Sequence, residues 1–94
     1  MEERVQLKHP RGKRAVNIPR HKYEAMRGAI VGSLKGGREL TATELTRAVE
    51  ARLRGKFEGS IPWYSEWVKL HLEALRSIER VSGAKAERYR LTAR

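Results

Sequence analysis

The sequence predicts an α+β fold that is mostly helical, with three helices, a C-terminal β-hairpin and a basic N-terminal extension. Two patterns carry this prediction: apolar residues recur at helical spacing in three segments after residue 20, and they alternate near the C-terminus as in strands. A chain of 94 residues is also too short to divide its apolar residues between two stable cores. We therefore expect an extension over residues 1–19 and one folded domain over residues 20–94.

The N-terminal extension combines two short alternating stretches with a high density of positive charge. Residues 5–7 and 16–18 alternate apolar and polar side chains around a turn-forming segment at 10–13, which fits a loose hairpin. Residues 1–22 hold seven basic and two acidic residues, a net charge of +5, which fits a basic arm. The sequence leaves both structures open.

The first two helices have clear start and stop signals. Helix one is expected over residues 20–34, where apolar residues recur every three or four positions before Gly36 and Gly37. Helix two is expected to begin at a capping box, in which the Thr41 hydroxyl and the Glu44 side chain each bind the other's backbone amide. Gly55 is expected to end it.

Helix three is expected to begin with Pro62 as its first residue and with Ser60 or Ile61 as its cap, because proline lacks an amide hydrogen that would have no partner there. Its apolar arc should comprise Tyr64, Val68, His71, Leu72 and Leu75, and its solvent face Ser65, Glu66, Lys69, Glu73 and Arg76. His71, at the edge of the arc, is interpreted as a packing residue. Alternation predicts strands at 79–82 and 88–92, with Arg88 and Arg90 pointing outward.

Composition limits the chemistry that this chain can perform. Twenty-one Lys and Arg against eleven acids, all of them Glu, give a net charge of +10, which attracts nucleic acid or anionic surfaces. The absence of cysteine excludes disulfides and thiolate sites, and the three histidines lack metal-ligand spacing. We therefore predict no enzyme, cofactor, metal or small-molecule ligand. Without a membrane segment or signal peptide, a cytoplasmic location is expected.

The order of these elements resembles the winged helix-turn-helix superfamily. Residues 68–81, Val-Lys-Leu-His-Leu-Glu-Ala-Leu-Arg-Ser-Ile-Glu-Arg-Val, look like the end of a recognition helix that leads into the first wing strand, and residues 40–45, Leu-Thr-Ala-Thr-Glu-Leu, look like the entry to helix two. Trp63 and Trp67 after a basic extension resemble in particular small uncharacterised prokaryotic proteins of that superfamily. The resemblance implies binding of double-stranded DNA, with helix three in the major groove.

The resemblance also implies which residues contact DNA. Base-edge candidates are Ser65, Glu66 and Lys69, with Trp63 near the edge of the groove, and the wing candidates are Lys85, Arg88 and Arg90. A basic arm would add Arg11, Lys13 and Arg14. Two features depart from the pattern: the connector before helix three is longer than usual, and Glu66 and Glu73 would repel phosphate.

Each candidate also has a structural interpretation. Lys69 lies at ion-pair spacing from Glu66 and Glu73, the wing arginines would protect a sheet edge, and the two tryptophans would pack in the core under the N-terminal segment. The expected role is in transcription or chromatin, with a nucleoid location. The alternative is a winged helix that binds a protein without contacting DNA. RNA as a ligand and a homodimer also remain open.

Overall fold

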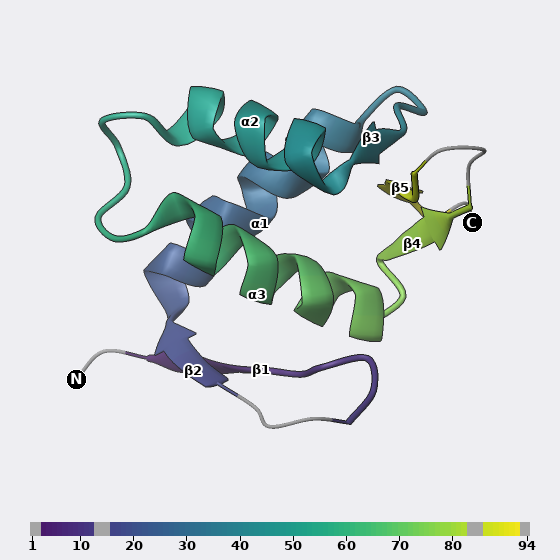
Figure 1. Cartoon of the computed structure of the whole chain (residues 1–94). Helices are drawn as coiled ribbons and strands as arrows, with labels where there is room; N and C mark the ends of the chain where they lie inside the picture. The colour runs from purple at the N-terminus through teal and green to yellow at the C-terminus, as the bar shows by residue number, and fades with distance from the viewer. Residues whose placement is uncertain (1–2, 13–15, 83–85, 93–94) are drawn as a thin grey trace.

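The computed structural model describes residues 3–12, 16–82 and 86–92 and shows an α+β fold of three helices and two small sheets. The helices are α1 (Arg20–Leu34), α2 (Ala42–Leu53) and α3 (Ile61–Ala74), and they pack against one another (Figure 1). Hairpin β1–β2 lies alongside α3, and hairpin β4–β5 follows its C-terminal end.

The local signals at the first two helices are confirmed. Helix α1 covers the expected residues, and Gly36 after its end adopts a left-handed backbone with φ +81°. At the start of α2, the Glu44 amide donates to the Thr41 hydroxyl at 3.2 Å. The Thr41 amide donates in return to Glu44 Oε1 at 2.9 Å, which completes the capping box.

Helix α3 begins one residue earlier than expected. The Ser60 hydroxyl caps it by accepting a hydrogen bond from the Trp63 amide at 3.2 Å, so Ile61 is the first helical residue and Pro62 the second. Proline fits this position equally well, because amides throughout the first turn have no intrahelical acceptor. The prediction of Pro62 as first residue was therefore wrong by one position, whereas Ser60, one of the two expected cap residues, is confirmed as the cap.

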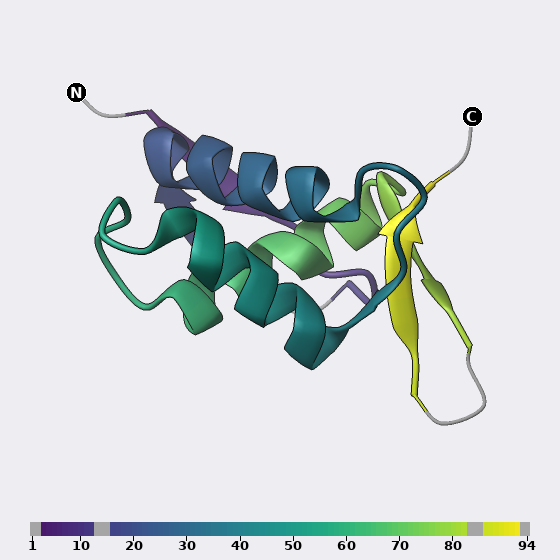
Figure 2. The same cartoon turned by 90° about the horizontal axis from the view of Figure 1, so that it is seen from above.

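Two antiparallel sheets complete the fold. Strands β1 (Arg4–Leu7) and β2 (Val16–Pro19) pair with each other, and β3 (Leu40–Thr41), β5 (Arg88–Leu91) and β4 (Ile78–Val81) form a second sheet in that order. The C-terminal hairpin is confirmed, with each strand ending one residue before its expected end. It projects beyond the helices, as Figure 2 shows.

The core lies between the three helices and takes side chains from both hairpins. Its buried apolar members are Leu7, Ile18, Tyr23, Met26, Ala29, Ile30, Leu34, Leu45, Val49, Val68, Leu72, Ile78 and Tyr89. Because β1 and β2 contribute Leu7 and Ile18, the hairpin alternative holds for residues 4–7 and 16–19, and an undocked arm is wrong there. Leu75, expected in the core, is 44% exposed and lies just after the last residue of α3.

Candidate nucleic-acid interface

The outer face of α3 does not present all of the expected base-edge residues. Ser65 is 2% exposed and Lys69 is 5% exposed, so the expectation that both face solvent was wrong. The Lys69 ammonium lies 2.8 Å from the Glu66 carboxylate and 4.6 Å from the centroid of the Tyr89 ring. Lys69 is thus held inside the structure by an ion pair and by a cation–π contact with Tyr89 of β5.

Glu66, a base-edge candidate, and Trp63, expected near the edge of the groove, remain exposed. Glu66 carries the negative end of the Lys69 ion pair on the protein surface, as its spacing predicted. Trp63 is 44% exposed, so its placement in the core was wrong, whereas Trp67 is half-buried and packs against the core. The Trp63 ring lies 4.9 Å from that of Tyr64 and 6.2 Å from that of Trp67, measured between centroids.

Hairpin β4–β5, the expected wing, exposes Arg88 and Arg90 as predicted, but acids neutralise them. Arg90 donates to Glu79 at 2.6 Å and lies 3.4 Å from Glu39. The hydrogen bond to Glu79 raises the pKa of Arg90 above its ordinary value. Arg88 lies 3.7 Å from Glu44. The interpretation of these arginines as charges that protect a sheet edge therefore has a structural basis.

Arg80, on the same hairpin, has an even denser set of partners. It donates to Glu73 at 2.6 Å and to Glu87 at 3.2 Å, and its guanidinium lies 5.4 Å from the centroid of the Tyr89 ring. The hydrogen bond to Glu73 raises the pKa of Arg80. The sequence pattern did not single out Arg80. In the structure, Arg80 is the centre of an ion-pair network because it contacts both Glu73 and Glu87. Lys85, the third wing candidate, lies outside the described residues.

Hairpin β1–β2 differs because its chain contains almost no acid. Residues 4–23 include seven Lys and Arg and no Asp or Glu. Arg11 is exposed in the turn between the strands, and Lys13 and Arg14 lie outside the described residues. Glu3, just before β1, pairs with Arg20 at 3.3 Å. The charge of the turn itself thus has no acidic neighbour along the chain.

His71 joins this hairpin to α3. Its Nδ1 accepts a hydrogen bond from the backbone amide of Lys8 at 2.9 Å, and its ring meets that of Tyr23 edge-on at 5.4 Å between centroids. Burial, followed by the nearby charge of Lys8, lowers the pKa of His71 from its ordinary value of 6.5. The prediction that His71 is a packing residue is confirmed, and the structure adds that it fixes the hairpin.

A polar hollow of about 460 Å³ separates the turn of β1–β2 from hairpin β4–β5 over the surface of α3. It is lined by His9, Pro10, Arg11, Glu66, Leu70, Glu73, Arg80 and Glu87. Because its glutamates pair with Lys69 and Arg80, the hollow has little uncompensated negative charge. The turn of β1–β2 and hairpin β4–β5 therefore stand on either side of the helix face that the resemblance assigns to DNA.

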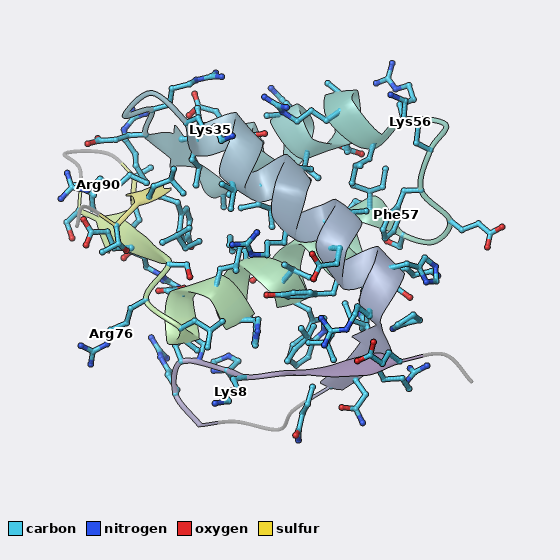
Figure 3. All side chains as sticks on the ribbon, turned by 180° about the vertical axis from the view of Figure 1, so that it is seen from behind. Lys8, Lys35, Lys56, Phe57, Arg76 and Arg90 are labelled. Atoms are coloured by element: carbon cyan, nitrogen blue, oxygen red, sulfur yellow. The ribbon has the colours of Figure 1, made fainter. Side chains whose placement is uncertain are left out.

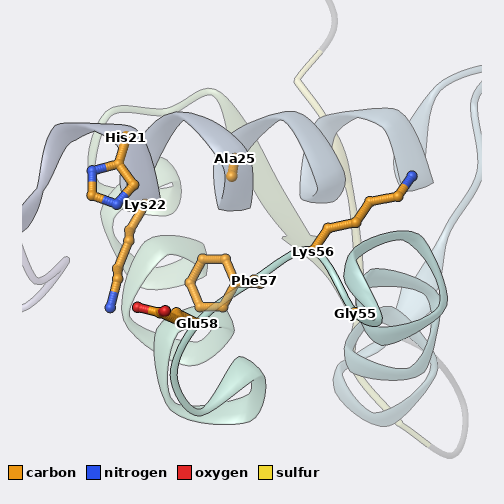
Figure 4. Close-up of a pocket in the computed structure, with 7 residues that line it drawn as sticks. All are labelled: His21, Lys22, Ala25, Gly55, Lys56, Phe57 and Glu58. Atoms are coloured by element: carbon orange, nitrogen blue, oxygen red, sulfur yellow. The ribbon is translucent and has the colours of Figure 1, made fainter.

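A second hollow, of about 490 Å³, lies away from this face, between the start of α1 and the connector after α2 (Figure 4). Phe57 and Ala25 form its apolar part, and Lys22, Lys56 and Glu58 supply its charges. The Lys22 ammonium lies 3.4 Å from the Tyr64 hydroxyl and 5.0 Å from the centroid of its ring. The described part of the chain contains no group of side chains that could hold a metal ion.

Comparison with known proteins yields a family match. The model of DUF6958, a family of unknown function, matches residues 4–89, from the first residue of β1 into β5. No curated protein and no solved structure matches this chain. Among the described residues, no helix has the length and apolar character needed to cross a bilayer.

Proposed function

We propose that this chain, which belongs to the family of unknown function DUF6958, is a winged-helix protein that binds double-stranded DNA mainly through its phosphates. The element order supports the fold. After the N-terminal hairpin, the chain runs α1, β3, α2, α3, β4 and β5, and the strands of the second sheet are ordered β3-β5-β4. This order puts a helix and a β-hairpin next to each other at one surface, as winged-helix DNA binding requires.

The distribution of charge is the observation that carries DNA binding. The chain has a net charge of +10, and seven of its cations lie in residues 4–23 without one acid. Lys8 and Arg11 belong to the hairpin that borders α3 and are exposed. A cationic surface of this kind gains affinity by releasing the counterions of DNA phosphates, whatever the base sequence.

The proposed interface reads few bases. With Ser65 and Lys69 buried, α3 offers Trp63 and the acidic Glu66 to a groove, so contacts with base edges would be sparse. Arg88 and Arg90 can still contact phosphate, because exposed ion pairs are weak and a phosphate can replace a glutamate as partner. We therefore propose weak sequence preference and an architectural or regulatory role on DNA, in transcription or chromatin.

Titration by fluorescence anisotropy tests this proposal. The purified protein is added to random duplex DNA, single-stranded DNA and duplex RNA of equal length at several salt concentrations. If about six phosphates are neutralised, the affinity for duplex DNA should fall roughly 1,000-fold between 50 and 200 mM salt. The variant Lys8→Glu with Arg11→Glu should lose most of this binding. Absence of binding at 50 mM salt, or an affinity independent of salt, would refute the proposal, and tighter binding to duplex RNA would redirect it to RNA.

The exposed tryptophan favours a second candidate, a protein-interaction module. Trp63 is 44% exposed beside the half-buried Trp67, and large aromatic side chains often anchor protein interfaces. In that case Trp63→Ala should weaken association with the partner, or with a second copy of the chain, while Lys8→Glu with Arg11→Glu should leave it nearly unchanged. DNA binding should instead be lost mainly in Lys8→Glu with Arg11→Glu, so the response of that double variant separates the candidates.

A further inference from the structure

The backbone at the end of α3 has an unusual residue in a left-handed conformation. Among the described residues, Arg76 is the single non-glycine residue with positive φ, at +63°. The Arg76 amide donates to the Glu73 carbonyl at 3.0 Å, and the Ser77 amide donates to the Leu72 carbonyl at 2.9 Å. These two bonds form a Schellman motif, with Arg76 in the position that is usually glycine.

The other two helices follow the usual rule. After α1 the left-handed positions are Gly36 and Gly37, and after α2 the left-handed position is Gly55. Glycine is favoured there because a Cβ atom crowds the neighbouring carbonyl oxygen. Arginine at the end of α3 therefore accepts a strain that glycine would remove, and strain of this kind is concentrated at functional positions.

The acids around Arg76 are already engaged by other arginines. Arg76 borders a hollow together with Glu73 and Glu79, but Glu73 binds Arg80 at 2.6 Å and Glu79 binds Arg90 at 2.6 Å. Arg76 itself is exposed and forms no ion pair with any residue that the structure describes. Its positive charge is thus available to an external anion.

The position of Arg76 fits the same surface as the N-terminal hairpin. Figure 3 shows the Arg76 side chain pointing away from the body of the protein, at the edge where Lys8 also lies. Lys8 is fixed at the C-terminal half of α3 by the hydrogen bond between its amide and His71. The two cations come from segments far apart in the sequence, and both lie toward the C-terminal half of α3.

We infer that Arg76 is a DNA-phosphate contact at the C-terminal end of α3, and that its left-handed conformation is retained because it directs the guanidinium outward. This inference rests on the proposed DNA binding and adds a DNA-contact residue that the resemblance to winged-helix proteins did not assign. The ligand chemistry is a phosphodiester, which the planar fork of guanidinium donors matches better than a lysine does.

Three variants test the inference by measuring affinity and thermal stability together. Arg76→Gly removes both the charge and the strain, whereas Arg76→Ala removes the charge and keeps the strain. Lys56→Ala removes the same charge at a connector away from Arg76, as Figure 3 shows, and is the matched control. Each variant is titrated with the random duplex DNA by fluorescence anisotropy at 100 mM salt, and its Tm is measured by circular dichroism.

Arg76→Gly and Arg76→Ala should both bind DNA about five- to tenfold more weakly than the wild type, with a salt slope smaller by about one. Lys56→Ala should lose less than twofold. The Tm of Arg76→Gly should exceed that of Arg76→Ala by about 4 °C or more, because glycine relieves the left-handed position.

The outcomes separate this inference from the proposed function. A wild type that does not bind DNA overturns the proposed function, and the inference falls with it. A wild type that binds, with Arg76 variants no weaker than Lys56→Ala, overturns the inference alone. Equal Tm values for the glycine and alanine variants would overturn the argument that arginine is strained at this position.

Discussion

The two hairpins that border α3 are alike in secondary structure and in burying apolar side chains, but they differ in how their charged side chains are paired. Hairpin β1–β2 is anchored by apolar burial, with Leu7 at 0% and Ile18 at 2% exposure, and by the bond from Lys8 to His71. Hairpin β4–β5 also buries Ile78 and Tyr89, but the arginines on its outer surface form ion pairs with glutamates. The arginines of β4–β5 are paired with glutamates, whereas Lys8 and Arg11 of the first hairpin have no ion pair among the residues that the structure describes.

This difference indicates where an anionic ligand would bind. Cations that already have carboxylate partners give up those partners when they contact a phosphate, whereas Lys8 and Arg11 have no such partner within residues 3–12, 16–82 and 86–92. The resemblance to winged-helix proteins directs attention to β4–β5, but the charge pattern favours β1–β2 as the stronger contributor. The comparison therefore predicts unequal effects of equivalent changes in the two hairpins.

The largest effect is expected from a core substitution in the first hairpin. Leu7→Ala should lower the free energy of unfolding by about 2–5 kcal/mol, because the side chain is fully buried and its removal leaves a cavity. Urea denaturation followed by circular dichroism measures the change. A loss below about 1 kcal/mol would mean that β1–β2 is a loosely attached arm, and the contrast in anchoring would disappear.

The next effect compares the charges of the two hairpins directly. Lys8→Gln with Arg11→Gln should weaken binding to duplex DNA by about 60-fold at 100 mM salt, as expected for two lost phosphate contacts. Arg88→Gln with Arg90→Gln makes the same change in net charge but should weaken binding less than tenfold, because both arginines are paired in the free protein. Anisotropy titrations of the two double variants side by side would contradict the comparison if the order of losses were reversed.

The smallest effect is a difference in pH sensitivity between the hairpins. Burial and the charge of Lys8 lower the pKa of His71, so the folded protein favours the neutral ring. The Nδ1 atom of this neutral ring accepts a hydrogen bond from the Lys8 backbone amide. As pH falls through the ordinary value of 6.5, the unfolded chain binds a proton that the folded chain resists, and stability declines. Urea denaturation at pH 7.5 and 5.5 should show a smaller decline in His71→Gln than in the wild type.

The ion pair of Arg88 with Glu44 should respond only at lower pH. The Thr41 backbone amide lowers the pKa of Glu44, the partner of Arg88, from its ordinary value of 4.5. The stability that this carboxylate contributes is present above that value and is lost as pH falls through its lowered pKa.

If His71→Gln and the wild type lost equal stability between pH 7.5 and 5.5, a group other than His71 would have to account for the decline.

The features that the sequence predicted well depend on neighbours along the chain. The bounds of α1, the capping box of Thr41 and Glu44, and the outward alternation of Arg88 and Arg90 all follow from local spacing. The alternation at 5–7 and 16–18 was also correct, but the segment between them is too long to carry a specific turn signal. The sequence therefore left a hairpin and an arm equally open.

The features that were missed depend on contacts between distant segments. Lys69 is polar and lies at ion-pair spacing from Glu66, so its spacing predicted the ion pair but not its burial beside Tyr89 of β5. Trp63 is apolar, yet it lies in the first turn of α3, where it remains 44% exposed. Arg76 gave no turn signal at all, because the sequence has no glycine where the backbone becomes left-handed.

The docking of β1–β2 has a practical consequence for anyone who shortens this protein. Trimming the chain to begin at α1 would look reasonable from the element order, because the three helices and the second sheet would all be retained. Such a trimmed protein would lose Leu7 and Ile18 and leave the core surfaces they cover open to water. We expect it to aggregate during purification, and a failure to bind DNA in that form would reveal nothing about the full chain.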